Sequence, residues 1–270
     1  MMPILKRQKV IALKTEDEFS YPYYIFIPET ISKSPEIFVT IHGITRNAAE
    51  HCLRYAQNFD LDNTVIIAPL FSKEAFKHYQ ILRTNDKGNR PSDALDAILN
   101  DVATRLGVYT KQFTLSGYSG GGQFAHRYAM LYPDKIKKLV LMAPGWYTFP
   151  NEGLAFPEGI GKSKEFSNLQ LFPKGLLSFP IDIIVGELDT RRDKTLNRTP
   201  SIDKHQGRNR LERSQNWVNS IENLSIGSKD VSLIKLKLVP GAGHSFTENF
   251  NKKAYVKSVQ QSTFPCKNTR

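Results

Sequence analysis

Short, strongly apolar runs alternate along the chain with segments whose apolar residues recur at helical spacing. The runs are rich in β-branched and aromatic residues and are almost continuously apolar, as strands covered on both faces must be. We expect strands at residues 23–28, 37–41, 64–69, 113–115, 138–143, 181–185 and 232–239. We expect helices at residues 47–59, 92–106, 121–132, 206–221 and 252–261. This alternation predicts an α/β fold, with a mostly parallel central sheet and helices on both faces.

The length and composition of the chain fit one domain. Its 270 residues, of which 40% are hydrophobic, suffice for one sizeable core but not for two ordinary enzyme domains with linkers. We therefore predict a single domain over residues 1–270. Residues 146–178 are rich in Gly, Pro, Phe and Lys and show neither the strand period nor the helix period. Since a long segment without regular structure is often functional, we predict that it forms a cap or lid over the site.

The most specific motif is Gly-Tyr-Ser-Gly-Gly at residues 117–121, between an expected strand and an expected helix. In this context G-x-S-x-G predicts a strained turn with a nucleophilic serine, Ser119, at its tip. Glycine is needed at both ends of the motif because side chains there would collide. The turn leaves the Gly120 amide at a helix N-terminus, aimed at a developing oxyanion. A phosphate-binding loop is disfavoured, since neither the Lys-Ser/Thr of a P-loop nor G-x-G-x-x-G spacing is present.

A serine nucleophile needs a base and an acid that orients the base. Among the six histidines, His244 stands in a glycine-rich loop directly after the last expected strand, at the carboxyl edge where open α/β sheets bind ligands. Asp189 follows another apolar strand at the same edge, with Asp193 as the runner-up and Glu187 as a more distant alternative. The chain order Ser, Asp, His is the one expected for this kind of turn.

The loop after the expected strand at residues 37–41 completes the predicted oxyanion hole. Gly43 is expected to let the backbone turn sharply, and the Ile44 amide is the predicted second donor beside Gly120. His42 is expected to support this loop by hydrogen bonding rather than to transfer protons.

We assign His42, Tyr118 and Trp146 to the substrate pocket. Trp146 belongs to a group of aromatic residues in the expected cap, together with Tyr147, Phe149, Phe156 and Phe166. These rings either line a pocket for the acyl or alcohol group or fill the core under a long loop, and both interpretations remain open.

The chain carries a formal net charge of +11 at pH 7. Clustered Lys and Arg attract polyanions, so nucleic acid and anionic surfaces have to be considered. The densest basic stretch, residues 191–213, is interrupted by acidic and turn residues and contains no recognised nucleic-acid-binding pattern. We therefore interpret it as a solvated basic face and expect no nucleic-acid partner.

No run approaches the ~20 apolar residues that span a bilayer. The N-terminal residues lack the continuous apolar core and cleavage site of a signal peptide. We therefore expect a cytoplasmic protein without a membrane partner. Cys52 and Cys266 stand far apart without metal-ligand or redox spacing, so we expect no metal site.

The chain resembles the α/β-hydrolase superfamily over most of its length. The residues that carry the resemblance are the His42-Gly43 loop, Ser119 and its turn, Asp189 and His244. Within that superfamily it is similar to bacterial hydrolases related to polyhydroxybutyrate depolymerases and feruloyl esterases. The resemblance implies a Ser-His-Asp triad, no metal and no organic cofactor. A single glycine follows His42 where many lipases have several, and there is no secretion signal as extracellular depolymerases would require.

We expect the chain to hydrolyse a small-molecule carboxylic ester through an acyl-enzyme intermediate. A peptidase or amidase is an open alternative, because the same nucleophile, base and oxyanion hole cleave amides. A non-catalytic ligand-binding homologue is disfavoured, because Ser119, Asp189 and His244 occur together with the glycines that the strained turn needs.

Overall fold

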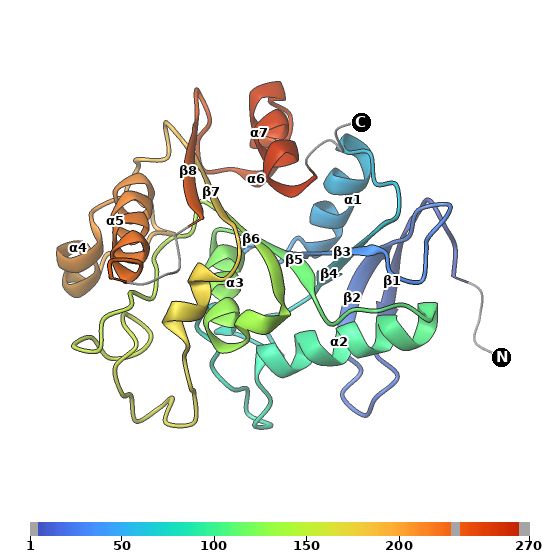
Figure 1. Cartoon of the computed structure of the whole chain (residues 1–270), viewed down its shortest axis with the longest axis horizontal. Helices are drawn as coiled ribbons and strands as arrows, with labels where there is room; N and C mark the ends of the chain where they lie inside the picture. Colours follow the sequence, from blue (N-terminus) through green and yellow to red (C-terminus); the bar gives the residue numbers. More distant parts are fainter. Residues whose placement is uncertain (1–4, 228–232, 265–270) are drawn as a thin grey trace.

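The computed structural model describes residues 5–227 and 233–264, which form a central sheet between two layers of helices (Figure 1). Over these residues the strand order is β1-β2-β4-β3-β5-β6-β7-β8. The first strands are antiparallel, β1 to β2 and β2 to β4, and all the later pairs are parallel. The bounds are β1 (Val10–Lys14), β2 (Pro22–Phe26), β3 (Glu36–Ile41), β4 (Thr64–Pro69), β5 (Phe113–Tyr118), β6 (Ile136–Met142), β7 (Ile181–Gly186) and β8 (Ile234–Val239). The predicted α/β fold with a mostly parallel sheet is confirmed.

The helices divide between the two faces of the sheet, as Figure 1 shows. One layer contains α2 (Pro91–Leu106), α3 (Gly120–Leu131) and α5 (Arg210–Leu224), and the other contains α1 (Ala48–Asn58), α6 (Phe246–Asn249) and α7 (Lys253–Thr263). Alternate strand residues supply the two cores: Val39 and Ile183 pack in the first layer, whereas Phe38 and Ile184 pack in the second. The helices α4 (Pro200–Gln206) and α5 follow β7.

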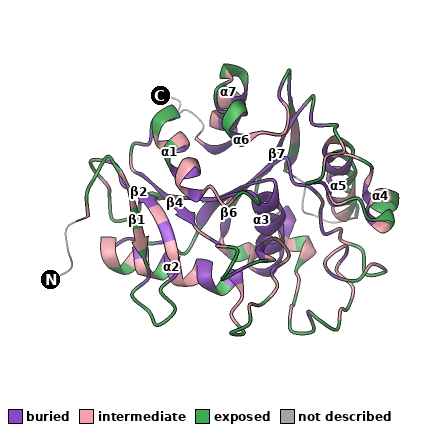
Figure 2. Ribbon diagram, turned by 180° about the vertical axis from the view of Figure 1, so that it is seen from behind, coloured by how far each residue is buried: buried purple, intermediate pink, exposed green. Residues whose placement is uncertain are grey.

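Helix α3 is enclosed along its whole length, like the strands β4, β5 and β7. Every one of its residues is buried, and Figure 2 shows the helix in the colour of buried residues. A helix that begins directly after Ser119 and is packed on all sides gives the turn before it a rigid support.

Several elements differ from the sequence expectation. The edge strand β1 was not expected; its side chains are only partly buried, so the apolar signal there is weak. The helix expected at 206–221 begins only at Arg210, as α5, because Gly207 adopts φ +111° and separates it from α4, a helix that was not expected. The strand expected at 232–239 begins at Ile234, and residue 232 lies outside the described residues.

Residues 146–178 connect β6 to β7 with little regular structure, namely the 3₁₀ turn η3 (Pro173–Leu177) and an isolated bridge. Three of the expected cap aromatics are buried. Tyr147 stacks on Trp217 at 4.8 Å between ring centroids, and Phe156 meets Phe166 at 4.7 Å. Tyr147 belongs to the hydrophobic core, whereas Phe156 and Phe166 line a small pocket within the segment. The role of the segment as a cap stays a prediction.

Cys52 is buried on α1, where burial raises the pKa of its thiol, and Cys266 lies outside the described residues. Over the part of the chain that the structure covers, no three His, Cys, Asp or Glu side chains gather in a group able to hold a metal ion. Among the helices of the described residues, none has the length and apolar character needed to cross a membrane.

Candidate active site

The turn between β5 and α3 holds Ser119 in a backbone conformation that L-residues rarely adopt. Its φ of 52° and ψ of −111° lie outside the ordinary regions. A Cβ added to Gly117 would lie 2.2 Å from the Gly121 carbonyl oxygen. A Cβ added to Gly121 would lie 2.0 Å from the carbonyl oxygen of Ile41, on the neighbouring strand β3. The predicted steric need for glycine at both positions therefore agrees with the geometry of the turn.

The structure brings Ser119, His244 and Asp189 into one hydrogen-bonded chain. The Ser119 Oγ lies 3.0 Å from Nε2 of His244, and Nδ1 of the same ring lies 2.7 Å from Oδ2 of Asp189. An ionised carboxylate only accepts hydrogen bonds, so Nδ1 carries the ring proton and Nε2 accepts from the serine hydroxyl. This is the arrangement in which the ring can take the serine proton.

Backbone contacts fix the loop of the acid against the loop of the base. Both loops leave neighbouring parallel strands, and the Leu188 amide donates to the Ala242 carbonyl at 2.9 Å. A Cβ added to Gly186 would lie 2.2 Å from that same carbonyl oxygen, so only glycine permits this approach. The Asn249 side chain donates to the Gly243 carbonyl at 2.8 Å, directly before His244.

The two alternative acids are engaged elsewhere. Glu187 is exposed and accepts from the Gly241 amide at 3.4 Å. Asp193 accepts from the amide and hydroxyl of Thr195 and from Arg210. Burial by itself would raise the pKa of Asp193, but these hydrogen bonds and the charge of Arg210 outweigh it and lower the pKa to about 2. Asp189 is therefore the acid in contact with His244.

The interpretation of residues 191–213 as a solvated basic face is wrong for its two innermost arginines. Arg210 and Arg213 are fully buried at the start of α5. Arg210 pairs with Asp189 at 3.1 Å, and Arg213 pairs with Asp203 at 2.8 Å and donates to the Gly145 carbonyl at 2.7 Å. Carboxylates pair with both buried cations, as a buried charge requires, while Nε of Arg210 has no hydrogen-bond partner among the described residues. Arg198 and Arg208 are exposed, as expected.

The amides of Gly120 and Ile44 adjoin each other beside Ser119. A Cβ added to Gly120 would lie 3.5 Å from the Ile44 nitrogen, and Gly120 is the first residue of α3. Across residues 5–227 and 233–264, neither amide has a hydrogen-bond acceptor. Two free backbone donors next to a serine hydroxyl can stabilise an oxyanion.

The expectation for Gly43 is wrong. Its φ lies outside the left-handed region, and a Cβ there would meet its nearest neighbour, the Tyr118 carbonyl oxygen, at an ordinary 3.5 Å. The loop turns instead through its hydrogen bonds, and the left-handed residue in it is Arg46, with φ 62°.

His42 acts as the internal support of this loop. Its ring is fully buried, Nδ1 lies 2.8 Å from the Gly43 carbonyl oxygen, and Nε2 accepts from the Phe71 amide at 3.0 Å. Burial lowers the pKa of His42 to about 4. Tyr79, which the sequence did not indicate, donates its hydroxyl to the His42 carbonyl at 2.7 Å. With both ring nitrogens occupied, His42 is a loop support and not a pocket residue.

Of the other two expected pocket residues, Tyr118 lies against His244, whereas Trp146 lies against Arg127. The Tyr118 ring is buried and lies against His244 at 5.4 Å between centroids, nearly parallel to it, so it limits the position of the base. Trp146 is half-buried, and the Arg127 guanidinium lies 4.3 Å from the centre of one of its rings.

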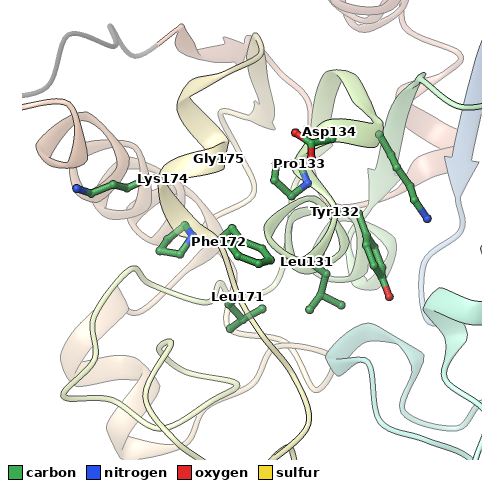
Figure 3. Close-up of a pocket in the computed structure, with 10 residues that line it drawn as sticks. Leu131, Tyr132, Pro133, Asp134, Leu171, Phe172, Lys174 and Gly175 are labelled. Carbon is green, nitrogen blue, oxygen red and sulfur yellow. The ribbon is translucent and has the colours of Figure 1, made fainter.

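A pocket of about 690 Å³ lies at the other end of α3 (Figure 3). Its lining includes Leu131, the last residue of that helix, and Phe172 beside η3. Since a helix rises about 1.5 Å per residue, this pocket is roughly 18 Å from the helix start at Ser119. It contains none of the predicted site residues.

Comparison with known proteins identifies the family. Residues 42–176, half of the chain, match the family model of the alpha/beta hydrolase fold. The chain belongs to the α/β-hydrolase fold family. No curated protein sequence matches it.

Solved structures agree with this assignment of the α/β-hydrolase fold. Poly(aspartic acid) hydrolase-1 from Sphingomonas sp. KT-1 is 22% identical at a TM-score of 0.77, over 95% of this chain and 98% of that one. LpqC, a poly(3-hydroxybutyrate) depolymerase from Bordetella parapertussis, is 23% identical at a TM-score of 0.75, over 93% and 89% of the two chains. A carboxylesterase from Mesorhizobium loti is 14% identical at a TM-score of 0.53, over 93% and 97%. At such identities the likeness is one of fold.

Proposed function

We propose that this α/β-hydrolase is a serine hydrolase that cleaves carboxylic esters through an acyl-enzyme intermediate. The observation that carries the proposal is the hydrogen-bonded chain from Ser119 through His244 to Asp189, with separations of 3.0 and 2.7 Å. Membership of the family supports hydrolytic activity, and the strained turn at Ser119 supports a role for this serine as nucleophile.

The first half of the reaction acylates the serine. Nε2 of His244 takes the hydroxyl proton while the Ser119 Oγ forms a bond to the ester carbonyl carbon. The carbonyl electron pair moves to oxygen, and the amides of Gly120 and Ile44 stabilise the resulting oxyanion. The intermediate then collapses, the carbon–oxygen bond to the alcohol breaks, and His244 returns its proton to the leaving alcohol.

The second half repeats these steps with water. His244 takes a proton from water, the hydroxide oxygen attacks the acyl carbon, and the serine leaves with the proton. Asp189 stays ionised throughout, holding the ring and stabilising the imidazolium in each half. Besides the ester and water, the proposed steps use only side chains and backbone amides of this chain.

Hydrolysis of p-nitrophenyl esters of graded acyl length tests the proposal. The wild-type protein should release p-nitrophenol, and Ser119→Ala should reduce the rate at least ~1000-fold with unchanged thermal unfolding. Ser116→Ala is a matched control, because this buried serine lies on β5 three residues away and outside the proposed relay. Wild-type activity in a folded Ser119→Ala variant would refute the assignment.

An amide substrate is the second candidate, favoured by the fold similarity to a poly(aspartic acid) hydrolase, whose substrate is joined by amide bonds. Matched ester and anilide substrates with one acyl group separate the two. A kcat/KM for the anilide equal to or above that for the ester would assign the site to amides.

A further inference from the structure

Arg210 joins the proposed catalytic acid to a second carboxylate. It is the first residue of α5, and its side chain is 1% exposed. Its Nη1 lies 3.1 Å from Oδ1 of Asp189 and 3.4 Å from Oδ2 of Asp193, and its Nη2 donates to Oγ1 of Thr195 at 2.9 Å. Oδ1 of Asp189 thus faces Arg210, while Oδ2 of the same carboxylate faces His244.

We infer that Arg210 and Asp193 are positioning residues for the proposed reaction: Arg210 fixes the Asp189 carboxylate, and Asp193 offsets the charge of Arg210. The inference rests on the proposed function of the Ser119 site. It adds to the site two residues that follow Asp189 in the chain, namely Asp193 before α4 and Arg210 at the start of α5.

The charge of the cluster is the first reason. Asp189 and Asp193 together carry two negative charges and Arg210 carries one positive charge, so the cluster keeps one negative charge for the imidazolium that forms on His244. Without Asp193, Arg210 would neutralise Asp189, and the stabilisation of the imidazolium would weaken. A buried cation next to a catalytic acid therefore needs a second acid.

Geometry is the second reason. The Asp189 side chain is wholly buried, and a carboxylate held only by His244 would be free to rotate about its last bond. The bond from Arg210 removes that freedom from the side opposite the ring. Arg210 is in turn fixed by the hydroxyl of Thr195 and by the rigid start of α5.

The other groups around the relay are neutral, exposed to solvent or paired elsewhere. Tyr118 on β5, Tyr147 after β6 and Tyr255 on α7 surround it, and burial raises the pKa of each phenol, so they carry no charge. Glu248 on α6 is exposed. Arg213, one turn further along α5, is paired with Asp203.

The test measures the rate of labelling by a fluorophosphonate as a function of pH, and compares the midpoint of its acid limb among variants. Asp193→Asn should move the midpoint down by roughly half a pH unit, because one negative charge is lost. Arg210→Met should move it up by about one unit, because the positive charge next to Asp189 is lost. Arg210→Met should also lower the plateau rate by about 10- to 100-fold through loss of the anchor.

Two further variants separate charge from folding. Arg210→Met combined with Asp193→Asn removes one charge of each sign, and its midpoint should lie between those of the two single variants, about half a pH unit above the wild-type value. Asp203→Asn is the matched control, since this carboxylate pairs with Arg192 and Arg213 but does not contact Arg210. It should leave the midpoint in place. Midpoints that do not move, or that move in the same direction in both single variants, would overturn the inference.

A second readout does not require catalysis. In NMR spectra, the pH midpoint of the His244 ring signals should move down in Asp193→Asn and up in Arg210→Met. A wild-type protein that shows neither labelling nor ester hydrolysis would refute the proposed function. Unshifted ring midpoints in Asp193→Asn would refute the role of this cluster, whatever the activity.

Discussion

Replacing Gly121 by alanine should damage both the stability and the proposed site. An alanine Cβ at this position would lie 2.0 Å from the Ile41 carbonyl oxygen and 2.6 Å from the His42 carbonyl oxygen. Real Cβ contacts essentially never fall below 3.0 Å, so the β3 end and α3 would have to separate by about 1 Å. Both obstacles are backbone atoms, which cannot rotate away as a side chain can.

The expected loss follows from this separation. Overpacking of a well-packed site costs about 1–3 kcal/mol, and two backbone contacts place Gly121→Ala at the upper end, about 3 kcal/mol. The loop that moves carries the Ile44 amide, and a displacement of about 1 Å at an oxyanion donor lowers a rate by roughly 100-fold.

Urea unfolding followed by fluorescence of the two tryptophans measures the first effect, with the m-value checked for two-state behaviour. Gly43→Ala is the matched control, because its new Cβ would meet only ordinary contacts at 3.5 Å or more. We expect that control to stay within about 1 kcal/mol of the wild type. A Gly121→Ala protein as stable as Gly43→Ala would refute the steric reasoning.

Three further outcomes follow from buried polar groups and from the half-buried tryptophan. Since burial lowers the pKa of His42 from 6.5 to about 4, the unfolded chain binds a proton in this window that the folded chain does not. The free energy of unfolding should therefore fall by at least about 3 kcal/mol between about pH 6.5 and pH 4, since burial also lowers the pKa of His51 and of His126, and a constant value in urea titrations would contradict this. Arg127→Met should lower that free energy by roughly 2–3 kcal/mol, because Thr148 and the Gln80 carbonyl lose a buried donor. Lys137→Met, which breaks only an exposed ion pair, should change it by less than about 1 kcal/mol, and equal losses would refute the contrast. Trp146→Ala should alter the preference for acyl chain length if this ring lines the acyl pocket of the proposed active site. An unchanged preference would assign the ring to packing on Arg127.

The parts of the fold that depend on local sequence could be predicted. The buried strands are runs of apolar residues, and the turn at Ser119 needs glycine two residues before and two residues after the serine. Each of these signals lies within a few consecutive positions of the sequence. The start of α2 at Pro91 and its end at Gly107, with φ +64°, follow from the same kind of local chemistry. By contrast, β1 is a partly buried edge strand with a weaker pattern.

The parts of the site that depend on distant partners could not be predicted. Arg210 belongs to a basic stretch, and only the fold shows that Asp189, 21 residues earlier, lies within 3.1 Å of it. One local signal was available, since Arg210 and Arg213 share the buried side of α5 with Trp217 and Ile221. Arginines that lie on the same helix face as an apolar stripe are expected to be buried and ion-paired.

Gly43 illustrates the opposite error. A glycine between a strand and a loop was taken to be required by the backbone, whereas the structure has room for a Cβ there. The shape of the loop depends on the imidazole of His42, which bonds backbone groups at Gly43 and at the distant Phe71. Residue type at a turn does not reveal which atom fixes the turn.

Mass spectrometry of the protein after incubation with a fluorophosphonate probe tests the central claim most directly, with Ser119→Ala and His244→Ala as controls. We predict one covalent adduct on the peptide that contains Ser119, absent from Ser119→Ala and strongly slowed in His244→Ala. Folded wild-type protein that takes no label, or that is labelled equally well without His244, would contradict the account of an activated serine.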